Sequence, residues 1–325
     1  MNMLRPLYLL LIICATGSCS SENTEPVPDD VVVFDACDNP TTEGVNDKRC
    51  LYTVSTLTES FNGSGGLTVD ENDFIYVADF GSVINNADGE IVSKIDPETG
   101  EVTEFAIGLK GPSGNAFAKN GNLIQANIQG NFVSEITPEG VVSTISDEGL
   151  ISPVGVVLDE DQNIYVCNCG GNSIQKINQN GASTVFVSDP ALNCPNGATI
   201  DTDGNIYVAN FNNSSIIKIA PDASLEVFAT LPGNNNSHLV FGNGVIYALS
   251  RGNDRLYEVT LDGEISVIAG NDEIGNVDGS GEEATFFIPN GIGISNDGSK
   301  IYVVSRLVGV GTPLNPVVVR VIEKK

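Results

Sequence analysis

The sequence predicts an all-β fold, a six-bladed β-propeller whose last blade is closed by the N-terminal strand. Three observations lead to this prediction. A strand-like phrase recurs six times along the 325 residues, at intervals of roughly 40 to 55 residues, which suits a blade of four short strands. Short β-branched and aromatic runs alternate with Gly, Asn and Asp turns, and 35 residues are glycine. The last repeat is one strand short, and a matching strand precedes the first repeat.

Each repeat contains the same parts in the same order. A short apolar strand opens with glycine in five copies and with Ser237 in the remaining one. A hairpin such as Asp203-Gly204 follows, and its glycine supplies the positive φ angle that a tight turn needs. The repeated phrase comes next, and two further strands complete the blade. The phrases occupy residues 75–79, 123–127, 164–168, 206–210, 246–250 and 301–305.

The two ends of the folded part are predicted to share one blade. Residues 317–322 form the third strand of the sixth repeat, and little chain remains after them. Residues 51–58 alternate like a fourth strand and precede the first repeat. Pairing these two segments covers an edge strand that would otherwise be exposed, and it locks the ring.

Residues 1–18 are expected to be an export signal. One arginine, a short apolar run and small residues precede Cys19, and the run is too short for a permanent membrane span. The pattern resembles a bacterial lipoprotein signal, which predicts lipidation of Cys19. The acidic run just after Cys19 resembles the surface-export signals of some outer-membrane lipoproteins, so we expect an anchor in the outer membrane at the cell surface. A plain signal peptide is the alternative. Residues 19–36 are acidic and contain proline, so we expect a flexible tether before a propeller over residues 37–325.

Cysteine usage agrees with export to an oxidising compartment. Cys37 and Cys50 bracket a polar loop before the first strand, and we expect them to pair. Cys169 and Cys194 fall on loops at the same end of adjacent repeats, and they form the other expected disulfide. Cys167 replaces an alanine of the repeated phrase, so we expect a small buried thiol. A metal site from Cys167, Cys169 and Cys194 is the alternative, but it lacks a fourth ligand of suitable type.

The charge of the chain restricts its partners. There are 42 acidic and 15 basic residues, a formal net charge of −27 at pH 7. This balance argues against nucleic acid, whose phosphates are bound through Lys and Arg, and against anionic lipid surfaces. We therefore expect no contact with nucleic acid, and contact with the membrane only through the lipid anchor. We also expect a monomer that binds a small molecule, a glycan or a protein.

The C-terminal part carries the motif of a known repeat family. Spaced small and apolar residues there resemble a full NHL repeat, which continues into the last hairpin and phrase. The residues that carry the resemblance are Ala269, Gly270, Gly275, Asp278, Gly279, Gly281, Ala284, Phe286, Pro289 and Gly291. Shorter versions occur at Pro195-Asn196-Gly197 and Pro153-Val154-Gly155. Over about residues 51–322 the chain is also similar to the regucalcin/gluconolactonase group of six-bladed propellers, a fold that serves binding proteins, lactonases, lyases and scaffolds.

The lactonase-like resemblance implies a divalent metal, usually calcium, at the mouth of the central channel. Its ligands resemble one Glu, two Asn and one Asp at the starts of the innermost strands. The matching positions, directly before the opening Gly or Ser, are Gly65, Ser113, Val154, Asn196, Asn236 and Asn290. None is a carboxylate, although carboxylates supply much of the affinity for calcium. Asn196, Asn236 and Asn290 are the candidate metal ligands, and they also fit a polar ligand rim or local turn bonds.

His238 is the only histidine of the chain. A Ser–His–Asp triad would have to pass through it, and a zinc lyase that needs several histidines is excluded. Its repeat equivalents are mostly apolar, which predicts a packed histidine. Ser113 and His238 join the three asparagines as candidate ligand-binding residues. The acidic hairpins at residues 70–73 and 159–161 fit turns better than calcium loops.

The leading functional hypothesis is a surface-displayed binding module that uses the loop face around the channel, including the loop at residues 270–288. Asp278, Glu282 and Glu283 on this loop could bend towards the channel. The alternative is a gluconolactonase-like lactonase with calcium as its cofactor, and a third hypothesis is a structural subunit of an envelope complex. The sequence contains neither a phosphate loop nor a dinucleotide fingerprint, and it identifies no catalytic residue.

Overall fold

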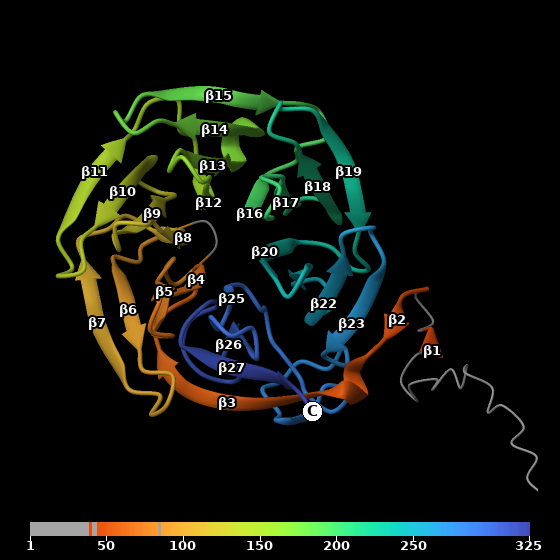
Figure 1. Cartoon of the computed structure of the whole chain (residues 1–325). Helices are drawn as coiled ribbons and strands as arrows, with labels where there is room; N and C mark the ends of the chain where they lie inside the picture. Colours follow the sequence, from red (N-terminus) through yellow and green to blue (C-terminus); the bar gives the residue numbers. More distant parts are fainter. Residues whose placement is uncertain (1–38, 41–43, 84–85) are drawn as a thin grey trace, which may run out of the picture. The chain divides into compact units, whose positions relative to one another are not determined.

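The computed structural model describes residues 39–40, 44–83 and 86–325, and within them the chain forms six β-sheets arranged in a ring (Figure 1). The helices among these residues are two 3-10 turns, at Arg49–Leu51 and Cys169–Gly171. No helix of this part of the chain is long and apolar enough to cross a lipid bilayer. The predicted all-β, six-bladed propeller is therefore confirmed.

Blades one to five each contain four antiparallel strands that follow one another from the ring axis outward (Figure 1). Blade one contains β4 (Leu67–Val69), β5 (Ile75–Ala78), β6 (Ile91–Ile95) and β7 (Val102–Ile107). Blade two contains β8 (Pro112–Phe117), β9 (Leu123–Asn127), β10 (Phe132–Ile136) and β11 (Val142–Ser146). Blade three contains β12 (Pro153–Leu158), β13 (Ile164–Asn168), β14 (Ser173–Ile177) and β15 (Ser183–Ser188). Blade four contains β16 (Pro195–Ile200), β17 (Ile206–Asn210), β18 (Ser215–Ile219) and β19 (Leu225–Thr230), and blade five contains β20 (Asn236–Gly242), β21 (Val245–Ser250), β22 (Arg255–Thr260) and β23 (Ile265–Ala269).

Blade six joins the two ends of the folded part. Its inner strands are β25 (Ile292–Ile294), β26 (Lys300–Arg306) and β27 (Val317–Lys324), and β3 (Tyr52–Phe61) pairs antiparallel with β27. The pairing extends from Val317 opposite Phe61 to Lys324 opposite Tyr52. The structure thus confirms closure by the N-terminal strand, and it lengthens the predicted strand from residue 58 to residue 61.

Three short strands were not expected from the sequence. β2 (Asn46–Asp47) adds to β23 in parallel, and β1 (Asn39–Pro40) pairs with β2, so the predicted polar loop before the first strand extends blade five. β24 (Gly279–Ser280) pairs with β3 and adds a short outer edge strand to the sheet of blade six. The predicted signal at residues 1–18, Cys19, the tether at residues 19–36 and Cys37 lie outside the described residues. Cys50 is disulfide-bonded.

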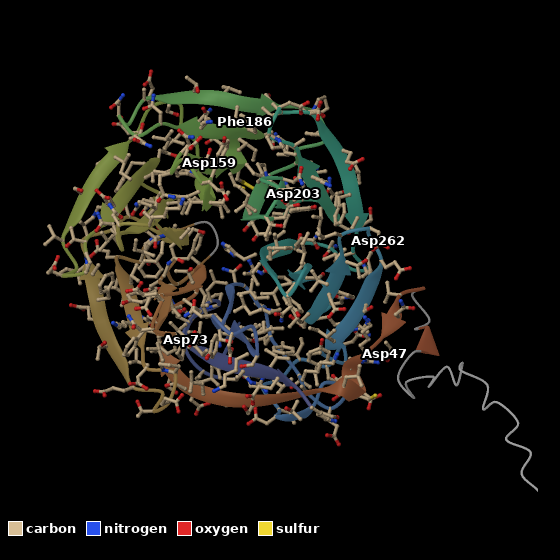
Figure 2. All side chains as sticks on the ribbon, viewed as in Figure 1. Asp47, Asp73, Asp159, Phe186, Asp203 and Asp262 are labelled. Carbon is tan, nitrogen blue, oxygen red and sulfur yellow. A yellow bond between two sulfur atoms is a disulfide. The ribbon has the colours of Figure 1, made fainter. Side chains whose placement is uncertain are left out.

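The blades pack closely around the axis because their inner strands carry glycine there. A Cβ atom on Gly114 would lie 2.7 Å from the Val154 carbonyl oxygen, and one on Gly291 would lie 2.8 Å from that of Gly65. Both distances are shorter than real Cβ contacts allow, so backbone meets backbone between neighbouring blades. Away from the axis, apolar residues of adjacent sheets fill the space between blades, as the side chains in Figure 2 show.

The hairpins between the first and second strands of blades one, three and four share one hydrogen-bonding arrangement, which is partly buried in blades one and three and buried in blade four. Asp70, Asp159 and Asp201 each accept a hydrogen bond from the hydroxyl of the tyrosine six residues later, at 3.1 to 3.2 Å. Each carboxylate also accepts backbone N–H groups of its own turn, such as Asn205 at 2.8 Å from Asp201. The acidic hairpins are therefore turn structures, as predicted.

Candidate functional site

A cavity of about 220 Å³ lies at the end of the ring where the innermost strands begin. Part of its wall comes from one repeated position, the residue directly after each repeated phrase. At this position the chain leaves the second strand and turns over the channel mouth. All six copies line the cavity, namely Phe80, Ile128, Cys169, Phe211, Arg251 and Arg306.

Backbone hydrogen bonds fix this position in most blades. The N–H of Phe211 donates to the Cys194 carbonyl at 2.9 Å, and the N–H of Arg251 donates to that of Asn235 at 3.2 Å. The phrase's last side chain supports the same loop, because the N–H of Asn193 donates to Asn210 Oδ1 at 3.0 Å. The repeat therefore supplies a rigid frame, and its side chains vary from blade to blade.

The second part of the wall comes from the starts of the innermost strands. Of the five candidate ligand-binding residues, Ser113, Asn196, His238 and Asn290 line the cavity. Asn236 does not line it. It is fully buried, and neither its Oδ1 nor its Nδ2 atom has a hydrogen-bond partner.

The pairing register explains why Asn236 was misplaced. Pro195 pairs with Asn210 and Ala198 with Val208 in blade four, whereas Asn236 pairs with Ser250 and Leu239 with Ala248 in blade five. The residues 210 and 250 are equivalent, so Asn236 takes the place of Pro195, and Ser237 precedes the glycine position. His238 occupies that glycine position itself. The predicted alignment of blade five was wrong by one residue, because Ser237 was taken for the opening residue.

His238 is consequently the one axial residue with a large side chain. It is 8% exposed. Its Nε2 reaches towards blade two, where it would lie 3.3 Å from a Cβ atom added to Gly114. The imidazole thus extends across the axis and forms the floor of the cavity. Its Nδ1 lies 3.0 Å from the Asn290 carbonyl oxygen, which can only accept, so Nδ1 carries the proton and Nε2 is an acceptor. Nε2 has no partner among the described residues.

Burial lowers the pKa of His238 to about 4, and the nearby charge of Arg251 acts in the same direction. The imidazole is therefore neutral at physiological pH. A neutral, sterically fixed ring suits a floor that is packed against the neighbouring blades.

Arg251 is the charged group of the cavity without a fixed partner. Its guanidinium lies 5.5 Å from the centre of the Phe211 ring, and no hydrogen bond or ion pair joins it to another described residue. Burial lowers its pKa to about 10, which still leaves it charged at neutral pH. Asp254 is near enough to interact with it through space, but its Oδ1 accepts the N–H of Ile288 at 2.7 Å.

Arg306 differs from Arg251 although it stands at the same repeat position. Its guanidinium donates to the carbonyl oxygens of Leu307, Val310 and Thr312, and it holds the following loop. This arginine is therefore a structural group that also places positive charge beside the cavity.

The predicted calcium ligands do not form a calcium site. Asn236 is outside the cavity, and Asn290 Nδ2 donates to the Ser64 carbonyl at 2.7 Å. No Asp or Glu of the described residues lines the cavity, whereas two arginines do. Within the described part of the chain, no cluster of three or more His, Cys, Asp or Glu side chains could hold a metal ion. The donor set therefore does not fit the metal that the lactonase-like resemblance implies.

The loop at residues 270–288 contributes less to the channel mouth than expected. Asp278 accepts hydrogen bonds from Thr56 and Arg320 and is held against β3 and β27, and Glu283 binds Ser280. None of these carboxylates lines the cavity; only Ile288, at the end of the loop, does so. The ion pair with Arg320 holds Asp278 beside β27 and away from the cavity.

The predicted disulfide between Cys169 and Cys194 is present, and it forms part of the cavity wall between blades three and four. Cys167 is a free, buried thiol, as predicted, and burial raises its pKa. The trio therefore does not form a metal site.

Arg251, Arg306 and Phe211 were not among the predicted site residues. A signal for them exists in the repeat, because all six cavity-lining residues directly follow the aligned phrase. The sequence prediction considered only the residues at the starts of the innermost strands, so it did not include these residues after the phrase. That the guanidinium of Arg251 has no hydrogen-bonding partner in the part of the chain that the structure describes depends on how blades four to six meet, and no local pattern encodes it.

Comparison with known proteins supports the fold at low sequence similarity. Residues 192–219 match the NHL repeat family. The match covers β16 to β18 of blade four, one of the shorter versions of the motif in the sequence. No curated protein sequence matches the chain.

Solved structures with the same fold have diverse roles. An auxiliary nutrient binding protein from Bacteroides thetaiotaomicron aligns at 15% identity with a TM-score of 0.68, over 84% of this chain and 77% of that one. A gluconolactonase from Xanthomonas campestris aligns at 14% identity and 0.65, over 84% and 89%. A virginiamycin B lyase from Staphylococcus aureus aligns at 13% identity and 0.56, over 84% and 100%. These similarities establish a fold that is shared with gluconolactonase-like proteins.

Proposed function

We propose that this protein is a binding propeller whose ligand occupies the cavity at the channel mouth. The observation that supports the proposal most directly is Arg251, a half-buried charge that lines the cavity and whose guanidinium has no hydrogen-bonding partner in the described part of the chain. Charged groups removed from water are costly unless they are paired. A bound ligand would supply the missing partner.

The floor and wall of the cavity agree with a binding role. His238 closes the channel beneath the cavity, and the disulfide between Cys169 and Cys194 stiffens one side. Side chains held in a rigid frame lose little entropy when a ligand binds. The nutrient binding protein with the same fold is consistent with such a role, although the likeness itself concerns the fold.

We further propose that the propeller is exported and tethered to the outer membrane at the cell surface by a lipid on Cys19. The support is the sequence pattern of residues 1–18 and the acidic tether at residues 19–36. Mass spectrometry of the protein from a membrane fraction tests this, since the proposal requires an acylated Cys19 as the first residue. A mature chain that begins elsewhere would contradict it.

Filling the cavity tests the binding proposal. Ile128 lines the cavity at a position that is aromatic in blades one and four, so Ile128→Trp should be accommodated while it occupies the ligand space. Ile107 is 59% exposed on the outer strand of blade one, and Ile107→Trp is the matched control. We expect small-molecule and glycan ligands found by calorimetry to lose affinity in the first variant only. Ligands that bind both variants equally would place the binding face elsewhere.

A calcium-dependent lactonase is the alternative function, favoured by the gluconolactonase of the same fold. It predicts that calcium raises the melting temperature and that Asn196→Ala abolishes lactone hydrolysis. Because the cavity carries arginines and no carboxylates, we expect the melting temperature to be the same with calcium and with chelator. A clear calcium-dependent rise would favour the lactonase.

A further inference from the structure

The charge of the cavity is opposite to that of the chain. The chain has 42 acidic and 15 basic residues, yet two arginines and no acidic residue of the described part line this cavity. Acidic side chains are the usual partners of buried arginines, as Asp278 is for Arg320. At the channel mouth, no acidic side chain of the described residues forms a hydrogen bond or ion pair with Arg251, and Asp254 interacts with it only through space. This reversal of charge indicates that the space is built to receive negative charge.

The position of Arg251 suits a planar anion. Its guanidinium lies against the Phe211 ring, 5.5 Å from the ring centre, which limits its orientations. A guanidinium presents parallel N–H donors that match the two oxygens of a carboxylate. The two terminal nitrogens of Arg306 donate to loop carbonyls, and its Nε is buried without a partner among the described residues, so Arg306 contributes mainly charge to the cavity. Arg251 is therefore the anchoring group.

The rest of the wall suits hydrocarbon. Phe80, Ile128, Val154 and Leu314 contribute apolar surface, and the neutral floor residue His238 adds a ring face. The volume of about 220 Å³ is below the roughly 300–1,000 Å³ of pockets for drug-sized ligands, so the ligand is small. Inorganic phosphate would satisfy the arginine but leave this apolar surface uncovered.

We infer that the ligand of the cavity is a small monocarboxylic acid with an apolar body, its carboxylate on Arg251 and its body against the apolar wall. The inference rests on the proposed binding function and names the ligand class of the same site. It excludes ammonium compounds, since two arginines repel them. It also distinguishes the site from a neutral sugar site, which would not need an unpaired arginine.

His238 makes the test direct because it is the only histidine of the chain. Its ring protons in the NMR spectrum of the purified full chain, without an added histidine tag, report on the cavity floor. Benzoate and benzamide share one ring and differ in charge, and acetate, butyrate and hexanoate differ in apolar length. We expect benzoate and hexanoate to shift the His238 signals in a saturable way at neutral pH. Benzamide should not.

The strength of binding should follow the chain length. Each added methylene buried against the wall should raise the affinity about fourfold, so hexanoate should bind far more tightly than acetate. Acetate and inorganic phosphate that bind as tightly as hexanoate would overturn the apolar part of the inference. Affinity that rises with length is the expected result.

Variants distinguish the direct role of Arg251 in binding from the effect of removing any one positive charge. Arg251→Leu should weaken benzoate binding roughly 10- to 100-fold, since it removes charged hydrogen bonds. Arg251→Lys should recover part of the affinity. Lys119 donates to the Glu160 carbonyl at the opposite, hairpin end of the ring, so Lys119→Gln removes one charge and should leave binding unchanged. Equal loss in Arg251→Leu and Lys119→Gln would overturn the inference.

The outcomes also distinguish this inference from the proposed function. If benzamide shifts the His238 signals as strongly as benzoate, the carboxylate class is wrong while the cavity remains a binding site. If the carboxylates bind without shifting these signals, they bind elsewhere and the inference fails. If no carboxylate binds but a ligand of another class is lost in Ile128→Trp, only the inference fails. If Ile128→Trp affects no ligand either, both fail.

Discussion

The hairpin end and the channel mouth of the ring differ in the hydrogen bonding of their buried polar groups. At the hairpin end, Asp201 accepts hydrogen bonds from the N–H groups of Asp203 and Asn205, from Asn205 Nδ2 and from the Tyr207 hydroxyl. At the mouth, Asn196 Oδ1 and His238 Nε2 are buried without a partner, and Arg251 has none among the described residues. Satisfied groups stabilise a fold, whereas unsatisfied ones cost stability. This contrast supports the binding role proposed for the mouth, whereas the satisfied groups of the hairpin end stabilise the fold.

The largest expected effect is at the hairpin end. Asp201→Ala should lower the free energy of unfolding by about 4 kcal/mol, since it leaves the buried Tyr207 hydroxyl and two turn N–H groups without an acceptor. Urea unfolding at pH 7 measures the loss. Asp222 makes only local bonds in an exposed turn, so Asp222→Ala is the control and should cost far less. Equal losses would remove the distinction between buried and exposed turns.

The next effect concerns the pH dependence of the free energy of unfolding, to which His238 and Asp254 near the channel mouth contribute. The pKa of His238 is about 4 in the folded state and 6.5 when unperturbed, so the unfolded chain binds the extra proton between these values. Stability from the neutral ring is complete above pH 6.5 and falls by about 3 kcal/mol as the pH drops to 4. Burial raises the pKa of Asp254 to about 6, so this carboxyl acts with the opposite sign over nearly the same range. The two contributions offset each other in the native chain.

Two variants separate these contributions. His238→Phe should become more stable relative to the native chain as the pH falls from 7 to 4.5, because it lacks the acid-sensitive ring. Asp254→Asn should become relatively less stable over the same range, because it lacks the carboxyl that gains a proton. Urea unfolding at both pH values gives the comparison. Parallel pH profiles for the three proteins would show that neither group titrates as described.

The fold could be predicted from the sequence because the repeat is consistent. The phrase ending at Asn210 marks the second strand, and the glycine at 197 marks the close approach to the next blade. Residues 51–58 precede the first repeat without a blade of their own, which matches the strand that the last repeat lacks. Blade five shows the limit. Its axial residue is His238 in place of glycine, so the glycine that sets the alignment of the other repeats is absent there. Asn236 was therefore predicted to lie at the channel mouth, where Ser237 holds the equivalent position.

The candidate site could be predicted only in part. Ser113, Asn196 and Asn290 precede their glycines, and the repeat places them at the mouth. The role of Arg251 depends on which groups fail to reach it, namely Asp254, held by the Ile288 N–H, and Asp278, held by Arg320. Whether an acidic side chain reaches Arg251 depends on contacts between segments that are distant in the sequence. A repeat pattern describes what recurs, and this site depends on what one blade does differently.

A smaller effect of the opposite sign is expected at Asn236. This residue is fully buried, and both polar atoms of its side chain lack partners. Asn236→Leu keeps a similar volume and removes two unsatisfied groups, so it should raise the free energy of unfolding by about 1 kcal/mol. Asn210 is also fully buried, but it accepts and donates hydrogen bonds, so Asn210→Leu should destabilise instead. Destabilisation of both variants would indicate that Asn236 has a partner.

Arg251→Leu is expected to have the smallest effect on stability, although its effect on ligand binding should be large. Arg251→Leu removes a charge that has no hydrogen-bonding partner among the described residues, so it should change the free energy of unfolding by less than about 1 kcal/mol. Arg320→Leu is the matched control, because Arg320 is fully buried and bonds the Thr285 and Val277 carbonyls and Asp278. Its loss should cost about 3 kcal/mol or more in urea unfolding. A similar cost for Arg251→Leu would mean that the protein itself satisfies this arginine, and the channel mouth would then resemble the hairpin end.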